Sequence, residues 1–325
     1  MLVRRKFLTL AGTAGAALAV SGIARAQAYP ARPVRVIVPA AAGGGADIIA
    51  RMFSQKLSEN IGQQFFIENL PTGAGNVGTG VAAKAPADGY TIILVTTSFV
   101  INATLNPKLP FDPIKDFAPI TLAATSPHAL VVYPALPAKT VQELAALVKA
   151  SPGKYSYASP GTGQSGQLTG ERFKLALGLD LVHVPFNGAA PAIASTVAGH
   201  TPMLFVSLPS VASGIREGTL RALAVTSARR SAAFPDIPTL AEAGFPNQES
   251  AFLLCFLAPA GTPKEIVDLL YREMAKVAGS ADIKARLLTL SFEPVANTPE
   301  ELGAQIKDEV AKWATVIKDA NIKVQ

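Results

Sequence analysis

Short runs of apolar and β-branched residues alternate along the chain with longer segments in which apolar residues recur at helical spacing. The short runs are continuously apolar, which is typical of strands buried on both faces of a parallel sheet. They lie at 34–38, 65–67, 91–96, 181–184, 203–208 and 220–226. This alternation predicts an α/β fold in which strand ends and helix starts gather at one edge of a sheet.

Several helix starts can be read directly from the sequence. A helix that begins near Asp47 places apolar residues on one face, namely Ile48, Ile49, Met52, Phe53, Leu57 and Ile61. Capping boxes of the form S/T-x-x-E predict further helix starts at Thr140, Thr262 and Thr298. Proline follows the last two caps, where its missing N–H has no cost, so we expect long terminal helices over 263–279 and 299–320.

Two apolar stretches are longer than an ordinary sheet strand. They cover 120–133, interrupted by Ser126-Pro127, and 252–259. One interpretation is a pair of crossovers between two lobes, and the other is a pair of long core strands. Periodicity alone does not choose between them.

The first 28 residues predict export. A basic cluster, Arg4-Arg5-Lys6, is followed by a Gly-interrupted apolar run over 7–23. Small residues then predict cleavage after Ala26 or Ala28, the order of a secretory signal peptide. A buried helix or a retained anchor fits this pattern less well, and the paired arginines also resemble a twin-arginine signal. We therefore expect a periplasmic protein.

Charge and composition narrow the possible partners. The chain has 29 basic and 23 acidic residues, but four basic residues and no acid lie within positions 1–26, so 25 basic residues remain and the mature net charge is only +2. We see no basic run typical of nucleic-acid binding. The lone Cys255 lies in an apolar run and cannot form an internal disulfide. A 49% hydrophobic content over a chain of this length predicts two domains.

Two segments, 73–78 and 161–166, match the dinucleotide fingerprint G-x-G-x-x-G. A nucleotide site also needs a preceding strand, a following helix and an acid at the end of the next strand. At 161–166 the strand and helix fit, but the next strand carries its acid, Asp180, at the wrong end. At 73–78 the next strand ends in Thr96-Thr97-Ser98, again without an acid. We therefore expect no dinucleotide cofactor.

Glycine-rich turns between a strand and a helix expose backbone N–H groups at the positive end of the helix dipole, where they bind anions. Three such turns occur, at 41–47, 72–76 and 161–165. If two α/β lobes face each other, these turns converge on a cleft in which Thr, Ser, Asn and Gln side chains supply further donors. Each turn alone is an ordinary connection, but the three together favour a carboxylate site.

Catalytic and metal-binding patterns are sparse. Ser165 lacks the G-x-S-x-G elbow of hydrolases, although a triad assembled in space stays open. His128, His183 and His200 lie far apart, without the spacing of a zinc site, so we expect no metal. Asp47 has two interpretations: an acid that interacts with the helix dipole, or a cleft residue that orients water or accepts a hydrogen bond from a ligand.

An ordered set of motifs runs through essentially the whole mature chain. The motifs are PAAAGGGADIIAR, IENLPTGAGNVG, ADGYTIIL, SPGTGQSGQLTGERFK, VHVPFNGAAPAI, RALAVTSARRSAAFPDIPTLAEAG and FLAPAGTPKEIV. Together they resemble the Bug (Bordetella uptake gene) family, the periplasmic solute receptors of tripartite tricarboxylate transporters. The resemblance implies a type II periplasmic binding fold, a two-lobed Venus flytrap whose lobe one covers 29–126 and 252–325 and whose lobe two covers 127–251.

The family's ligands are mostly small carboxylates, held by N–H and hydroxyl groups of the glycine loops, and hydrogen bonds to a charged acceptor are strong. The resemblance implies ligand-binding roles for Ala42, Gly43, Gly44, Asp47, Gly73, Ala74, Gly75, Asn76, Thr97, Ser98, Gly161, Thr162, Gly163, Ser165, Gln167, Phe186, Asn187, Val206 and Ser207.

Several positions depart from the family's usual pattern. Thr72 replaces a glycine and Leu70 a basic residue. Gln167 stands where a histidine is common, and Val206 where an aspartate is usual. A cleft that loses a carboxylate and gains valine should prefer a plain or aromatic acid over an amino acid.

The sequence thus predicts a monomeric, non-enzymatic receptor without a cofactor. It would bind a dicarboxylate, tricarboxylate or aromatic acid, close by hinge motion and deliver the ligand to membrane permease subunits. Two alternatives stay open: an exported hydrolase or cofactor-dependent oxidoreductase, and an accessory receptor that reports to a signalling protein.

Overall fold

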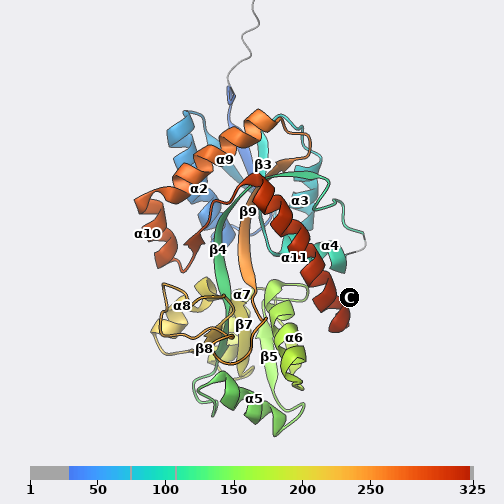
Figure 1. The fold of residues 1–325 in the computed structure, drawn as a ribbon, viewed down its shortest axis with the longest axis vertical. Helices are drawn as coiled ribbons and strands as arrows, with labels where there is room; N and C mark the ends of the chain where they lie inside the picture. Colours follow the sequence, from blue (N-terminus) through green and yellow to red (C-terminus); the bar gives the residue numbers. More distant parts are fainter. Residues whose placement is uncertain (1–28, 74, 107, 323–325) are drawn as a thin grey trace, which may run out of the picture. The chain divides into compact units, whose positions relative to one another are not determined.

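The computed structural model describes residues 29–73, 75–106 and 108–322. Residues 29–31 belong to a separate unit, and the fold below is that of the unit beginning at Arg32. Its strands form a ten-stranded sheet in the order β2-β1-β3-β9-β4-β7-β5-β6, with β8 and β10 each pairing with β4 (Figure 1). The strands are β1 (Val34–Val38), β2 (Phe65–Asn69), β3 (Thr91–Thr96), β4 (Phe117–Val132), β5 (Ser156–Ser159), β6 (Val182–Pro185), β7 (Met203–Ser207), β8 (Arg221–Val225), β9 (Ala251–Pro259) and β10 (Glu293–Pro294).

Parallel pairing was expected from the continuous apolar runs, and the sheet is mixed. β1 is parallel to β2 and β3, and β5 is parallel to β6 and β7. The pairings of β4 with β7, β8 and β9, and of β3 with β9, are antiparallel. The expectation is therefore wrong for β8, because continuous apolarity reports burial on both faces and not strand direction.

β4 is shared by two wings of the sheet. Its residues 117–127 pair with β9, whereas from His128 onward it pairs with β7 and β8. We call β2-β1-β3-β9-β4-β10 the β1 wing and β6-β5-β7-β4-β8 the β5 wing. The two interpretations of the longer apolar stretch are thus compatible, since β4 is both a long core strand and a passage from the β1 wing to the β5 wing.

Helices cover the faces of both wings (Figure 1). They are α2 (Gly45–Ile61), α3 (Asn76–Ala83), α4 (Ser98–Leu105), α5 (Val141–Lys149), α6 (Ser165–Leu177), α7 (Ala189–Val197), α8 (Leu208–Arg216), α9 (Lys264–Gly279), α10 (Ala281–Thr289) and α11 (Pro299–Asp319). Most of them follow a strand directly, which places their N-terminal ends at the carboxyl edge of the sheet, where ligands of open α/β sheets bind.

The predicted caps have mixed outcomes. Thr298 and Glu301 form the full capping box, and Thr140 accepts from the Glu143 N–H. The cap at Thr262 is wrong, because its hydroxyl donates to the Pro259 carbonyl at 2.7 Å and α9 begins without a side-chain cap. Helix α10 was not expected from the sequence.

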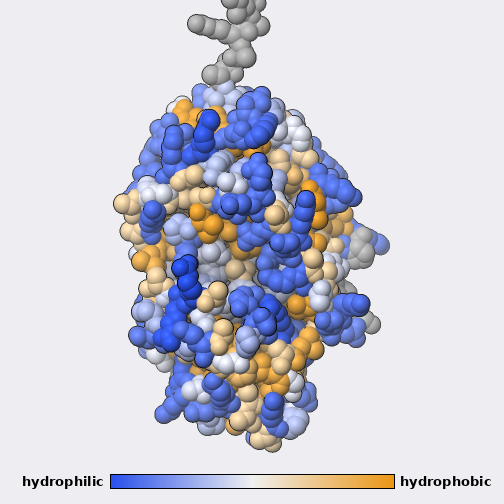
Figure 2. All heavy atoms as spheres, viewed as in Figure 1, coloured by the Kyte–Doolittle hydropathy of each residue, from blue (hydrophilic) through white to orange (hydrophobic). Residues whose placement is uncertain are grey.

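Each wing has its own apolar core. In the β1 wing the core joins β1, β3 and β9 to α4 and α11, with Trp313 fully buried. On the face shown in Figure 2, hydrophilic residues cover most of the surface and hydrophobic ones form small separate patches. In the part of the chain that the structure describes, no helix has the length and apolar character to cross a bilayer.

Candidate functional site

Asp47 organises the first glycine loop, at the start of α2. Its side chain is only 3% exposed, although residues 41–45 of the loop are exposed. One carboxylate oxygen accepts from the Gly43 N–H at 2.9 Å and from Arg51 at 2.9 Å, and the other accepts from the Asn69 amide at 2.9 Å. Both carboxylate oxygens of Asp47 thus have partners within the protein, and their hydrogen bonds fasten the first loop to α2 and β2.

The same contacts set the charge state of Asp47. Burial by itself raises the pKa of a carboxyl group, because it disfavours the charged form. Hydrogen bonds from Arg51, Gly43 and Asn69 outweigh that effect and hold the pKa of Asp47 below its ordinary value. Asp47 is therefore ionised at neutral pH, with its charge compensated by Arg51.

The third glycine loop is fastened by neutral groups. Gly163 donates its N–H to the Gln167 side-chain carbonyl at 2.7 Å, and the Gln167 amide lies 3.2 Å from His183 Nδ1. The other ring nitrogen of His183 lies 2.7 Å from the Ser159 hydroxyl. Burial lowers the pKa of His183 to about 4, so its ring is neutral at pH 7. The Gln167 side chain therefore fixes the conformation of the loop through hydrogen bonds to Gly163 and His183.

Two glycines of the GTGQSG motif meet strict steric demands. Gly163 has φ +75°, and a Cβ there would lie 2.9 Å from a methyl group of Leu105 on α4. A Cβ on Gly166 would lie 2.4 Å from the Phe205 carbonyl oxygen. Only glycine at position 166 therefore allows α6 to approach β7 this closely. These glycines position the helix start against the sheet, as in a dinucleotide fold, without the acid that a ribose needs.

Side chains of α4 contact both the second and the third loop. Asn102 donates to the Asn76 side chain at 2.8 Å, and Ser98 donates to the Gln164 side-chain carbonyl at 2.9 Å. The latter bond joins the β1 wing to the β5 wing. Leu168 of α6 strengthens this junction, since it is fully buried in the core of the β1 wing.

A small cavity of about 20 Å³ lies where the ends of β1, β3 and the second loop come together. Gly75, Asn76, Thr96 and Ser98 line it, among others. This volume is about that of one water probe, and the lining offers several polar partners, the two conditions for a buried water. The second loop also includes Gly73, which is exposed, and Ala74, which lies outside the described residues.

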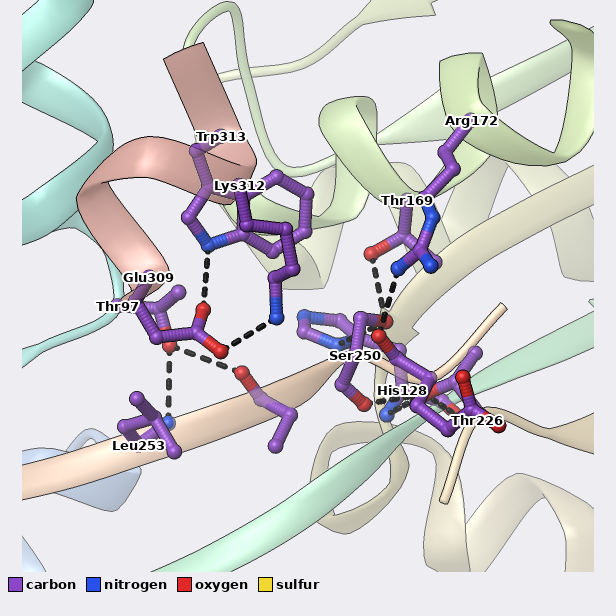
Figure 3. A network of polar contacts seen from close by, with 12 residues as sticks. Thr97, His128, Thr169, Arg172, Thr226, Ser250, Leu253, Glu309, Lys312 and Trp313 are labelled. Atoms are coloured by element: carbon purple, nitrogen blue, oxygen red, sulfur yellow. Dashed lines mark hydrogen bonds and ion pairs between the residues drawn. The ribbon is translucent and has the colours of Figure 1, made fainter. Parts of the chain in front are cut away.

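His128 centres a buried polar network where β4 passes between the wings (Figure 3). Its Nε2 lies 2.8 Å from the Ser165 hydroxyl, and its Nδ1 lies 3.5 Å from that of Ser250. Ser250 also contacts the Thr169 hydroxyl at 3.1 Å, and Thr226 donates to the Ser250 carbonyl at 2.6 Å. The network links β4, α6 and the segment that enters β9.

The Ser165–His128 pair has the spacing of a nucleophile and its base, but not its surroundings. A triad has a carboxylate at the second ring nitrogen, whereas here that nitrogen faces a hydroxyl, Ser250. His128 is 1% exposed, and burial lowers its pKa to about 4, far below the range that suits a general base at pH 7. The geometry fits a structural pair at the N-terminal end of α6.

The other predicted positions fall into two groups. Thr97 is buried, and its hydroxyl donates to the Ala251 carbonyl and accepts from the Leu253 N–H (Figure 3). Both hydrogen bonds of this hydroxyl group are thus made within the β1 wing. Val206 is 1% exposed and packs in an apolar cluster of the β5 wing, so it offers no surface to a ligand here. The preference for a plain or aromatic acid over an amino acid stays a prediction. Half-buried or exposed are Ala42, Gly44, Gly161, Thr162, Phe186, Asn187 and Ser207.

Sequence reasoning missed several residues of this region. Gln164 lies in the predicted turn 161–165, but it occupies a variable position of the G-x-G-x-x-G pattern, so its hydrogen bond to Ser98 could not be foreseen. Ser250 and Thr226 are distant in sequence from His128, so no local pattern connects them. The break in the apolar run at Ser126-Pro127 was the one available signal for the passage of β4. Among the described residues, no group of three or more His, Cys, Asp or Glu could hold a metal ion.

Comparison with known proteins identifies the family of this chain. The model of the tripartite tricarboxylate transporter family receptor matches residues 49–322. Protein BugT of Bordetella pertussis is 33% identical over 315 residues, covering 96% of this chain and 95% of its own. A Pseudomonas protein described as "UPF0065 protein in tcbD-tcbE intergenic region" is 37% identical over 309 residues, covering 94% and 92%.

Solved structures agree with the family match. R. palustris Rpa4515, solved with adipate, has a TM-score of 0.83 and 34% identity, covering 91% of this chain and 99% of its own. MatC of Rhodopseudomonas palustris, solved with bound malate, has a TM-score of 0.78 and 29% identity, covering 89% and 100%. The chain has the α/β, two-lobed fold of periplasmic solute-binding proteins, and it belongs to the receptor family of tripartite tricarboxylate transporters.

Proposed function

We propose that this protein is an exported receptor that binds a small carboxylate between its glycine loops and hands it to a membrane permease. One observation carries the proposal: helix starts from both wings of the sheet meet, and the Ser98–Gln164 hydrogen bond joins them. The N-terminal ends of α4 and α6 bring positive dipole ends, and backbone N–H groups that have no partner within their own helix, to this junction.

The charges at the loops suit an anion held by dipoles. Asp47 is compensated by Arg51, and the third loop is fastened by a neutral amide and a neutral imidazole. An anionic ligand therefore meets no uncompensated negative charge from these fastening groups. Adipate and malate, found in two similar structures, are small dicarboxylates of the kind such a site would hold.

The remaining parts of the proposal follow from the family and the sequence. We infer that residues 1–28, which lie outside the described residues, are a signal peptide cleaved near Ala26 or Ala28. We also infer that the mature protein is a periplasmic monomer and that it has no enzymatic activity. The domain division at 126/127 and 251/252 remains part of this proposal. It is supported by the passage of β4 between wings at Pro127–His128.

A thermal-shift screen of carboxylic acids on the mature protein tests the proposal. A ligand at a hundredfold excess over Kd stabilises the folded state by about 2.7 kcal/mol, a shift that is readily measured. We expect one class of acids to raise Tm, with no turnover product detectable by mass spectrometry. A flat screen, or conversion of the acid, would contradict the receptor function.

A further inference from the structure

A crevice of about 370 Å³ runs from the first glycine loop along helix α8. Gly45 of the first loop and Ser207 at the end of β7 are among its lining residues, so the crevice reaches the first glycine loop of the proposed site. Its volume is within the range of small-molecule pockets. It therefore has room for the body of a ligand whose charged group lies at the loops.

The two walls of the crevice differ in chemistry. The wall from the β1 wing is largely apolar and includes Ile48, Phe252 and Phe292. The Phe292 ring packs close to Gly45, where an added Cβ would lie 3.4 Å from it, so the apolar wall begins at the loop itself. An aliphatic or aromatic body fits this wall better than a polar one.

The opposite wall is one face of α8. Ser210, Ser213 and Arg216 line it at intervals of three residues, the spacing that places side chains on the same side of a helix. At a rise of about 1.5 Å per residue, Arg216 lies roughly 13 Å along the helix from Ser207. The crevice thus has a cationic group at the end away from the glycine loops.

Arg216 is available for a ligand. Its side chain makes no ion pair among the residues that the structure describes, whereas Arg51, Arg35 and Arg230 each pair with an acid. Its guanidinium lies 4.9 Å from the centre of the Phe234 ring, a cation–π contact that limits where the charge can point. A guanidinium held in this way is suited to a carboxylate.

We propose that Arg216 determines specificity, and that the preferred ligand is an elongated dicarboxylate with an apolar spacer. One carboxylate lies at the glycine loops, the spacer lies along Phe252 and Phe292, and the second carboxylate meets Arg216. This inference rests on the proposed function, since it requires the first carboxylate to bind at the loops.

Isothermal titration calorimetry with two series of acids tests the inference. The dicarboxylates run from succinate to sebacate and include terephthalate, and the matched monocarboxylates are decanoate and benzoate. We expect the longer dicarboxylates to bind more tightly than succinate. Arg216→Gln should weaken them about fivefold to tenfold, as expected for a charge-assisted bond at an exposed site, and should leave succinate and decanoate unchanged.

Two further variants keep the test specific. Arg272→Gln removes the same charge from an exposed position on α9, outside the crevice, and should change no affinity. Ser213→Phe fills the crevice from the exposed face of α8 and should exclude sebacate and terephthalate while succinate still binds. If succinate binds best and Arg216→Gln changes nothing, the inference is wrong and the proposed function stands. If none of these acids binds, the inference is wrong, and the thermal-shift screen decides whether the proposed function stands.

Discussion

The first and third glycine loops are fastened in the same geometry by different chemistry. In each loop, a glycine with positive φ donates its N–H to a side chain four residues further on. The pairs are Gly43 with Asp47, at 2.9 Å, and Gly163 with Gln167, at 2.7 Å. The acceptor is a carboxylate balanced by an arginine in the first loop, and a neutral amide in the third.

This difference shows what the loops require and what they tolerate. Both need an acceptor at the fourth position, because it fixes the turn that precedes the helix start. Neither needs a charge there for the geometry itself, since Gln167 serves as well as Asp47. The charge at Asp47 instead engages Arg51 and Asn69, so it also ties α2 to β2.

The largest effect should come from Asp47→Ala. It leaves the Gly43 N–H, Arg51 and Asn69 without their acceptor, and we expect a loss of about 2–3 kcal/mol in the free energy of unfolding. Arg51 is half exposed, which keeps the loss below that of a fully buried pair. Urea denaturation measures it. Asp47→Asn should cost less because it retains an acceptor; equal losses would show that the acceptor geometry is unimportant.

Gly163→Ala should disturb the third loop by about 2 kcal/mol, through the left-handed backbone and the contact with Leu105. Gly178→Ala is the matched control. It also has positive φ, but an added Cβ there meets no atom within 4 Å. We expect only Gly163→Ala to weaken ligand binding in calorimetry. An equal loss of affinity in both variants would show that ligand binding does not depend on the shape of the third loop.

Gln167→Ala should cost about 1–2 kcal/mol, less than Asp47→Ala, because only neutral hydrogen bonds are lost. Gln167→His restores the residue common in the family and tests whether an imidazole can fasten this loop. Urea midpoints of both variants measure the effect. A loss from Gln167→Ala as large as that from Asp47→Ala would contradict the distinction between charged and neutral fastening.

Acid should affect the two loops in different pH ranges. Burial lowers the pKa of His128 and His183 to about 4, so the unfolded chain binds protons between pH 6.5 and 4 that the folded protein does not. Their contribution is complete above pH 6.5 and falls as pH drops through this window. The pKa of Asp47 is lowered from 3.8, so its contribution is lost only at lower pH.

Urea midpoints at pH 7, 5.5 and 4.5 check this dependence. We expect a steady decrease, and a smaller decrease in His183→Gln, which cannot take up a proton. An unchanged midpoint across the range would show that the histidines do not control acid stability.

Much of the fold could be predicted from the sequence. The bounds of β1 and β3 match the apolar runs at 34–38 and 91–96, because each strand is buried and pairs with a neighbour on both sides. Strand direction could not be predicted, since a strand buried on both faces has the same composition in either orientation. The failed cap at Thr262 has a local cause, because its hydroxyl bonds the Pro259 carbonyl instead.

The candidate site was predictable only in part. The glycine loops could be located because strand-to-helix turns need glycine, but their fastening depends on contacts that form in space. Ser98 and Gln164 are 66 residues apart, and no pattern links them. The crevice along α8 likewise brings together residues from α2, β9 and α8, so Arg216 appeared as an ordinary basic residue at a helix end.

The central claim is that glycine loops from both wings of the sheet bind a carboxylate through N–H and hydroxyl donors. Calorimetric titration with the best acid from the screen and with its neutral amide tests this most directly. The account predicts micromolar or tighter binding of the acid and at least about a hundredfold weaker binding of the amide, because hydrogen bonds to charged groups are roughly twice as strong. Equal affinity for acid and amide would contradict the account.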